Sequence, residues 1–237
     1  MSFSPASPPI QLKLLGDFGV RTGAQTVPIR RCGQKLLAFI AISRSPVSRP
    51  TLAGILWPET PASRAAANLR AALSRLPRPF NRQLVRSDDG RVALADDLLV
   101  DLHDATALIE NPSGAVGPAL QSWTSDLLPL WDEDWVLLER ERYRQGRLHA
   151  LEQLGRRLLD QRRHGEAMQA GLAALAGEPL RETAHRLVIE VHLAEGNAAE
   201  ALRQYYLYRD LLRSELGLAP SSALRHLVRP LLERPED

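Results

Sequence analysis

The chain has 237 residues, of which 44% are hydrophobic and 24% charged, which is typical of a globular protein with room for two domains. No apolar run approaches the roughly 20 residues that span a bilayer, and the first ten residues lack the basic and apolar segments of a signal peptide. We therefore predict a cytoplasmic protein that makes no membrane contact. Cys32 is the only cysteine, which excludes an internal disulfide and a cysteine-based zinc site.

Charge is unevenly distributed along the chain. Up to Leu99 there are 14 Lys and Arg against 6 Asp and Glu, a net charge of +8, whereas the remainder has 16 against 22, a net charge of −6. A polyanion would be attracted by the first half and repelled by the second. Any nucleic acid is therefore expected to bind the N-terminal half.

Residues 10–99 are predicted to form a winged helix-turn-helix domain of the response-regulator output type, after a disordered tail over residues 1–9. Alternating apolar residues, helical apolar spacing, a Ser48 cap and an Asp89-Gly90 turn support this order of elements. The expected elements are strands in 11–20, helices over 34–43, 48–57 and 60–77, and a hairpin of 84–86 with 91–94.

The third helix separates its apolar and basic residues onto two faces. Leu69, Leu73 and Leu76 lie roughly 120 to 180° away from the basic face at 100° per residue. Solvated arginines would explain this pattern in an isolated helix, but the neighbouring elements favour a helix that docks through its leucines and enters the major groove of DNA. The basic face, within about 80° on the same helical projection, comprises Arg64, Asn68, Ala71, Arg75 and Arg78.

Arg75 and Asn68 are the candidates for base contacts, because guanidinium and amide groups can form paired hydrogen bonds with base edges. Arg64, near the start of the helix, is expected to contact phosphate with the help of the backbone amides there. Arg86 and Arg91 of the hairpin are expected to lie along the DNA backbone or the minor groove.

A basic cluster at the start of the first helix has two interpretations. Arg30, Arg31 and Lys35 could hold a phosphate, or they could be a solvated cluster without a ligand. The sequence leaves both open.

Residues 100–237 are predicted to form a tetratricopeptide-like all-α domain, which makes the whole chain mostly α with a small β component. The segment repeats with a period of 34, the tetratricopeptide length, so that Leu159 matches Leu193 and Glu166-Ala167 matches Glu200-Ala201. Turns are expected at His164-Gly165 and Gly196-Asn197, and the exposed helix faces are candidates for partner proteins.

A catalytic function has little support. The chain has no glycine-rich phosphate loop, nucleophile elbow or metal-binding motif, so we predict no catalytic residue, no metal and no cofactor. The alternative to a DNA-binding protein is a protein-interaction module whose winged helix is a scaffold. The arginine helix and the opposite charges of the two halves argue against that alternative.

Together the two halves resemble the Streptomyces antibiotic regulatory protein family, which joins an output-type winged helix to a bacterial transcriptional activator domain. The similarity covers nearly everything from Ile10 to Leu232. The matching phrases include LKLLGDFGV, LWPETPASRAAANLRAALSRL, VDLHDA, DLLPLWDEDWVLLER and, toward the C-terminus, HGEAMQAGLAALAGEPLRETAHRLVIEVHLAEGNAAEALRQYYLYRDLLRSELGLAPSSAL.

The resemblance implies a transcriptional activator that binds direct repeats in double-stranded promoter DNA as two protomers and recruits RNA polymerase holoenzyme, with secondary-metabolite genes as targets. Two positions depart from the family pattern. Pro77 stands where a basic residue is usual, so the third helix is expected to stop early and lose a phosphate contact, and Ser125 replaces a glycine.

Overall fold

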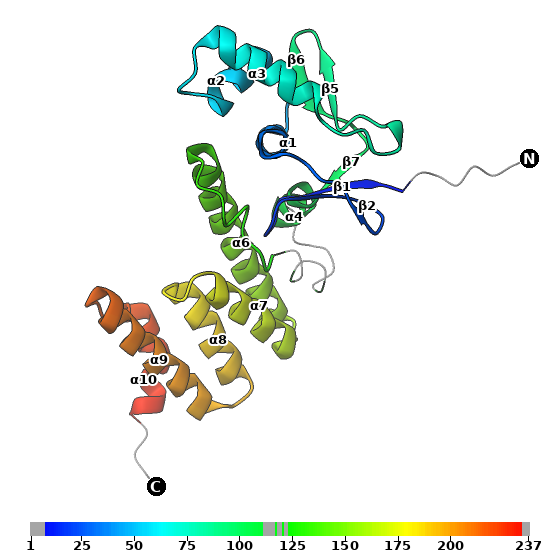
Figure 1. The fold of residues 1–237 in the computed structure, drawn as a ribbon. Coiled ribbons are helices and arrows are strands. Elements are labelled where there is room, and N and C mark those ends of the chain that lie inside the picture. The colour runs from blue at the N-terminus through cyan, green and yellow to red at the C-terminus, as the bar shows by residue number, and fades with distance from the viewer. Residues whose placement is uncertain (1–7, 111–116, 118–119, 121–122, 234–237) are drawn as a thin grey trace, which may run out of the picture. The chain divides into compact units, whose positions relative to one another are not determined.

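The computed structural model describes residues 8–110, 117, 120 and 123–233 and divides the chain into two compact units (Figure 1). The first unit contains residues 1–104 and 126–140, and the second contains residues 105–125 and 141–237. Most of the predicted N-terminal tail, residues 1–7, lies outside the described residues.

A four-stranded sheet brings together both ends of the winged-helix region. Its strands are β1 (Ile10–Lys13), β2 (Gly19–Thr22), β3 (Gln25–Thr26) and β7 (Leu98–Val100), in the order β3-β2-β1-β7. β1 pairs antiparallel with β2 and parallel with β7. Alternate side chains of β1, Ile10 and Leu12, are fully buried, as expected for a strand with one face toward the core.

Three helices follow the first three strands: α1 (Arg31–Ser43), α2 (Arg49–Leu56) and α3 (Ala62–Ser74). Ser48 caps α2 as predicted, since its Oγ accepts a hydrogen bond from the Thr51 amide. α3 is shorter than the predicted range of 60–77. Pro61 is its N-cap and forms no side-chain cap, and Pro77 disfavours helical geometry in the residue before it.

The predicted hairpin, which we call the wing, is confirmed. It consists of β5 (Val85–Asp88) and β6 (Arg91–Leu94), and the short β4 (Val47–Ser48) pairs with the other edge of β6. Asp89 and Gly90 have φ values of 44° and 72°, the left-handed values that a two-residue turn requires.

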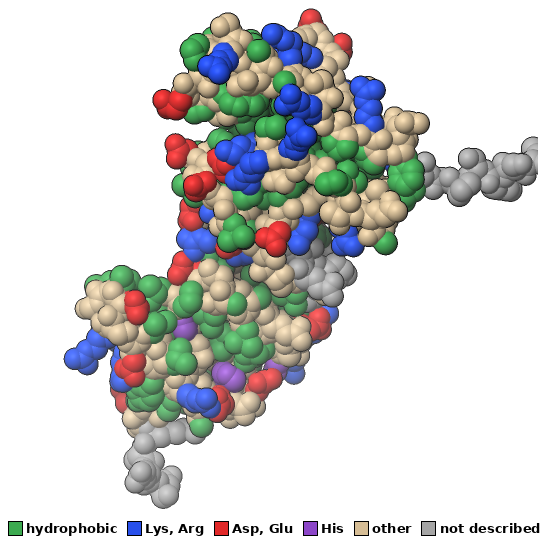
Figure 2. Space-filling view, viewed as in Figure 1, with side chains coloured by type: hydrophobic (Ala, Val, Ile, Leu, Met, Phe, Trp, Pro, Cys, Tyr) green, Lys and Arg blue, Asp and Glu red, His purple; other side chains and the backbone are tan. Residues whose placement is uncertain are grey.

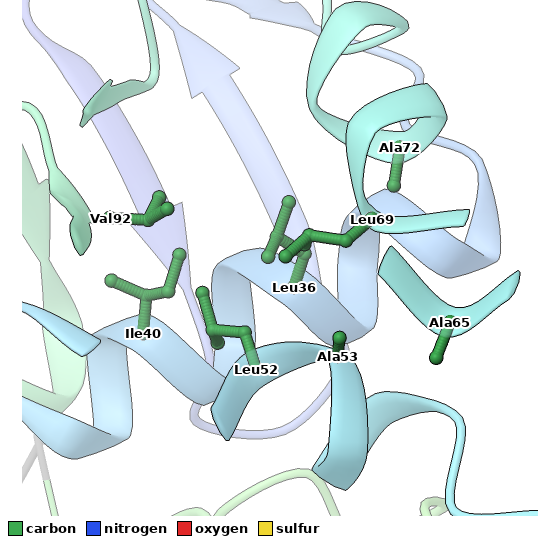
Figure 3. Packing of buried hydrophobic residues seen from close by; sticks show 8 residues of the cluster. All are labelled: Leu36, Ile40, Leu52, Ala53, Ala65, Leu69, Ala72 and Val92. Carbon is green, nitrogen blue, oxygen red and sulfur yellow. The ribbon is translucent and has the colours of Figure 1, made fainter. Parts of the chain in front are cut away.

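A hydrophobic core holds the three helices and the wing together. Figure 3 shows Leu69 of α3 pointing toward Leu36 of α1, with Leu52 of α2 beside them. Val92 of the wing is fully buried in the same cluster. The cluster consists of Leu36, Ile40, Leu52, Ala53, Ala65, Leu69, Ala72 and Val92. Because the apolar side of α3 packs in this core, its opposite side faces the solvent.

Residues 126–140 also belong to the first unit. The amide of Gly16 donates to the Asp126 carbonyl at 2.8 Å, and the Trp131 ring stacks on Phe18 with 5.8 Å between ring centroids. The first unit therefore extends beyond the boundary predicted at residue 99, because a segment distant in sequence completes it.

The second unit is helical. Its complete helices are α7 (His164–Gly177), α8 (Glu182–Ala194), α9 (Ala198–Leu216) and α10 (Ser222–Leu232). α4 (Asp101–Glu110) and α6 (Asp134–Asp160) begin in the first unit and contribute residues from 105 and from 141 onward.

One predicted turn of the helical unit is wrong and one is confirmed. α7 already begins at His164, and the left-handed residue before it is Arg162, with φ of 59°. Gly196 does form the predicted turn, with φ of 77°. Close helix packing also depends on Gly155, because a Cβ there would overlap the side chain of Leu187.

Candidate nucleic-acid interface

α3 presents an exposed basic surface opposite its buried face. Ala65, Leu69 and Ala72 are at most 3% exposed, whereas Leu73 and Leu76 are half-buried. Of the residues predicted to contact DNA, Arg64 and Arg75 are exposed, and Asn68 and Ala71 are half-buried. Figure 2 shows Lys and Arg side chains of the first unit gathered over the region of α1, α3 and the wing.

The sequence predicted Arg75 and Arg78 on the third helix, but neither residue is part of α3. α3 ends at Ser74, which leaves Arg75 as its C-cap with φ of −92° and ψ of 0°. Arg78 follows Pro77 and has a non-helical conformation, with φ of −121° and ψ of 76°. Both side chains are exposed beside the end of α3. The helical projection that grouped Arg78 with Arg64 therefore does not apply to it.

Two basic residues near α3 were not among the predicted contacts. Arg70 is exposed on the side of α3 that borders α2, and Arg49 is the first residue of α2. On a helical projection Arg70 lies roughly 120° from Arg64, which places it outside the narrow basic face that the sequence predicts. Arg49 lies outside the third helix altogether.

Six of the arginines around α3 and the wing have no carboxylate partner. No ion pair with a carboxylate of the described residues is formed by Arg49, Arg64, Arg70, Arg75, Arg78 or Arg91. Their charges are therefore available to a ligand that carries negative charge.

The wing contributes one unpaired and one paired arginine. Arg91 is exposed at the start of β6. Arg86 on β5 contacts Asp96 at 3.2 Å, and both side chains are more than half exposed. Such an exposed ion pair contributes little to stability, so a phosphate can replace the carboxylate at small cost.

Two of the three basic residues at the start of α1 are neutralised within the protein. Glu133 accepts from Lys35 at 2.6 Å and from Arg31 at 3.0 Å, and the Arg31 guanidinium lies 3.9 Å from the ring centroid of Trp131. Burial raises the pKa of Glu133, but the hydrogen bond from Lys35 and the nearby charges outweigh it, so the net shift is downward. Arg30 is exposed at the N-cap of α1.

The described residues offer no group of three or more His, Cys, Asp or Glu side chains that could hold a metal ion. Among the helices that the structure describes, none has the length and apolar character needed to cross a membrane.

A family model for the bacterial transcriptional activator domain matches residues 89–232. The chain belongs to this family. It is also 33% identical over 193 residues to the regulatory protein AfsR of Streptomyces coelicolor, a match that covers 75% of this chain and 19% of AfsR. For AfsR of Streptomyces griseus the identity is 29% over 194 residues, with 76% and 20% covered. The resemblance to the Streptomyces antibiotic regulatory protein family is thereby confirmed, and the chain spans about a fifth of the length of these relatives.

The fold class is confirmed by a solved structure. EmbR of Mycobacterium tuberculosis, in complex with a low-affinity phosphopeptide, matches with a TM-score of 0.72 at 22% sequence identity. The match covers 96% of this chain and 66% of the EmbR chain. The chain is mostly α with small sheets, and it joins a winged helix to a tetratricopeptide-like helical domain.

Proposed function

We propose that the chain is a sequence-specific activator of transcription that binds double-stranded promoter DNA through α3 and the wing. The observation that carries this proposal is the set of unpaired arginines around a helix whose opposite face is locked into a hydrophobic core. An α-helix fits the major groove of B-form DNA, where each base pair shows a distinct pattern of donors and acceptors. Membership of the transcriptional activator family supports the same function.

Base recognition is proposed for Arg75 and Asn68, and phosphate contact for Arg64. Arg75 stands at the end of α3, where its side chain is exposed and unpaired. Arg64 lies in the first turn, next to an N-terminus without a side-chain cap, so backbone amides there are available to a phosphate. Ala71 leaves room for close approach to the groove.

Sequence-independent contacts are proposed for Arg78, Arg86, Arg91 and Arg30. They are exposed and surround the recognition helix on the wing, on the loop after α3 and at the N-cap of α1. Arg31 and Lys35 are left out of the proposed interface, because a phosphate would have to displace Glu133 from both. This differs from the phosphate site that the sequence allowed.

The finer function follows the family resemblance. We propose that two protomers bind direct repeats spaced about one helical turn, roughly 34–36 Å, and that the bound pair recruits RNA polymerase at a secondary-metabolite promoter in the cytoplasm. The similarity to AfsR, named as a regulatory protein, supports this assignment.

The experiment is retardation of labelled genomic promoter fragments by the full chain at several salt concentrations. We expect retardation of particular fragments and a steep loss of affinity as salt rises, because phosphate contacts release counterions. Footprinting of a retarded fragment would show the repeat spacing. A chain that retards no fragment from the genome at low salt would favour the protein-interaction module instead.

A further inference from the structure

A groove between α2 and α3 is left open in the first unit. Its volume is about 590 Å³. Most of its lining is apolar, including Ala53, Trp57, Ala66 and Leu69, and Arg49 and Arg70 are its only charged lining residues among those described. DNA has little apolar surface with which to fill such a groove, whereas apolar protein side chains fit it. The groove is therefore complementary to apolar side chains flanked by carboxylates.

The same chain presents a surface of that kind at the start of α6. Leu137 and Leu138 are 46% and 59% exposed, although both are leucines in a helix. Asp134 lies three and four residues before them, so the three side chains are neighbours on the helix surface. Asp132 precedes them and is also exposed. We call Asp132, Asp134, Leu137 and Leu138 the acidic leucine patch.

The patch carries uncompensated negative charge. No cation among the described residues forms an ion pair with Asp132 or Asp134, whereas the neighbouring Glu133 is occupied by Arg31 and Lys35. Exposed leucines beside unpaired carboxylates match an apolar groove beside unpaired arginines in both polarity and charge.

We propose that the acidic leucine patch of one copy docks into the α2/α3 groove of a second copy. Leu137 and Leu138 enter the groove, and the carboxylates of Asp132 and Asp134 face Arg49 and Arg70. The two surfaces differ, so the contact is heterologous: each copy uses its patch on one neighbour and its groove on another.

This geometry suits direct repeats, and in that respect the inference rests on the proposed function. Two protomers on repeats of the same orientation are related by translation and rotation along the duplex, which excludes a two-fold contact and requires a heterologous one. DNA holds the copies at high effective concentration, so a small contact is sufficient to make their binding cooperative.

Gly54 allows the groove to be filled without disturbing the fold. It lines the groove on α2, and a Cβ added there meets no atom within 4 Å. Gly54→Phe therefore places a ring in the groove. Gly165→Phe is the matched control, because Gly165 is also an exposed helical glycine with open space around it, in the helical unit.

The first experiment compares a DNA fragment carrying two repeats with one carrying a single repeat. Two test variants are Gly54→Phe and the double variant Leu137→Ser/Leu138→Ser. Both are expected to bind the single repeat with the affinity of the parent protein. On two repeats, the cooperative gain in affinity is expected to be about tenfold smaller than in the parent protein. Gly165→Phe and Leu207→Ser, which changes another exposed leucine, are expected to retain it. Unchanged cooperativity in both test variants overturns the proposed contact while leaving DNA binding intact.

A second experiment works without DNA and is independent of the proposed function. In a Cys32→Ser background, protein with Gly54→Cys is mixed with protein with Leu138→Cys under mild oxidation at high concentration. A disulfide requires the two Cα atoms to approach within about 7 Å, so crosslinked heterodimers are expected to form about tenfold faster than with Gly165→Cys in place of Gly54→Cys. Equal crosslinking rates with Gly54→Cys and with Gly165→Cys overturn the contact.

Discussion

The arginines of the two units are used in opposite ways. Around α3 and the wing, Arg64, Arg70 and Arg75 form no ion pair among the described residues. In the helical unit, arginines are tied to carboxylates of the same unit; the pairs include Arg144 with Glu141 and Glu178, Arg163 with Glu166, Arg181 with Glu152, Arg186 with Glu190 and Arg203 with Glu200.

The difference shows that paired arginines contribute to folding, whereas unpaired arginines remain available for binding. A paired arginine contributes to the geometry of its own unit, and its field is largely cancelled at a distance. An unpaired arginine on a helix fixed by a leucine core contributes little to folding, and it keeps its charge for a ligand. Substitutions at a buried pair of the helical unit should therefore affect stability, whereas substitutions around α3 should affect affinity.

The largest effect is expected from breaking the buried pair of the helical unit. Glu152 is 2% exposed, and it accepts from Arg181 and from the Thr183 hydroxyl. Glu152→Ala leaves these donors without their acceptor, so the free energy of unfolding should fall by about 3–5 kcal/mol. Urea denaturation followed by circular dichroism measures it. Glu200→Ala, at an exposed pair, is the control and should change stability by less than about 1 kcal/mol.

A smaller effect is expected on DNA affinity from the end of α3. Arg75→Ala should weaken specific binding by about 1–3 kcal/mol and relax the preference at one base position, with stability unchanged, because the side chain is exposed and unpaired. Mobility shifts on the cognate fragment and its single-base variants provide the measurement. Arg203→Ala in the helical unit serves as the control. Unaltered affinity of Arg75→Ala for the cognate promoter would remove Arg75 from the proposed interface.

The wing should affect affinity without affecting specificity. Arg86→Ala is expected to weaken binding to all sequences alike, since a phosphate contact carries no sequence information. The slope of log K against the logarithm of the salt concentration should become less steep by about one unit. Titrations of cognate and unrelated fragments at several salt concentrations test it. A selective loss on the cognate fragment would instead place Arg86 at a base.

Acidification should weaken the helical unit through His185. This side chain is 2% exposed; its Nε2 donates to the Pro179 carbonyl, and its Nδ1 accepts from Gln204. Burial lowers the pKa of His185 below 6.5, so the neutral form stabilises the fold above that pH and the contribution is lost as pH falls through the folded-state pKa.

Between about pH 6.5 and about pH 5.5 the free energy of unfolding should therefore fall because of this residue. Urea denaturation at both pH values measures the change. His185→Gln should show a smaller pH dependence than the parent protein, and an equal dependence would assign the effect to other groups.

Features that depend on neighbours in the sequence were predictable from it. The Ser48 cap, the Asp89-Gly90 turn and the turn at Gly196 follow from hydrogen bonds and φ preferences within a few residues. The leucine face of α3 follows from helical periodicity. The observed end of α3 at Ser74 lies before the predicted end at residue 77, because Pro77 also disfavours helical geometry in the residue that precedes it.

Features that depend on distant residues were decided by the tertiary structure. Glu133 lies 102 residues from Arg31, and no local pattern indicates that it neutralises this arginine and Lys35. The α2/α3 groove likewise depends on how two helices pack rather than on the sequence of either. The sequence therefore determined the helices and the wing through local hydrogen bonds and periodicity, and it determined the basic character of the N-terminal half through composition. Which charges remain available to a ligand depended on long-range contacts, because an ion pair forms only where folding brings its two partners together.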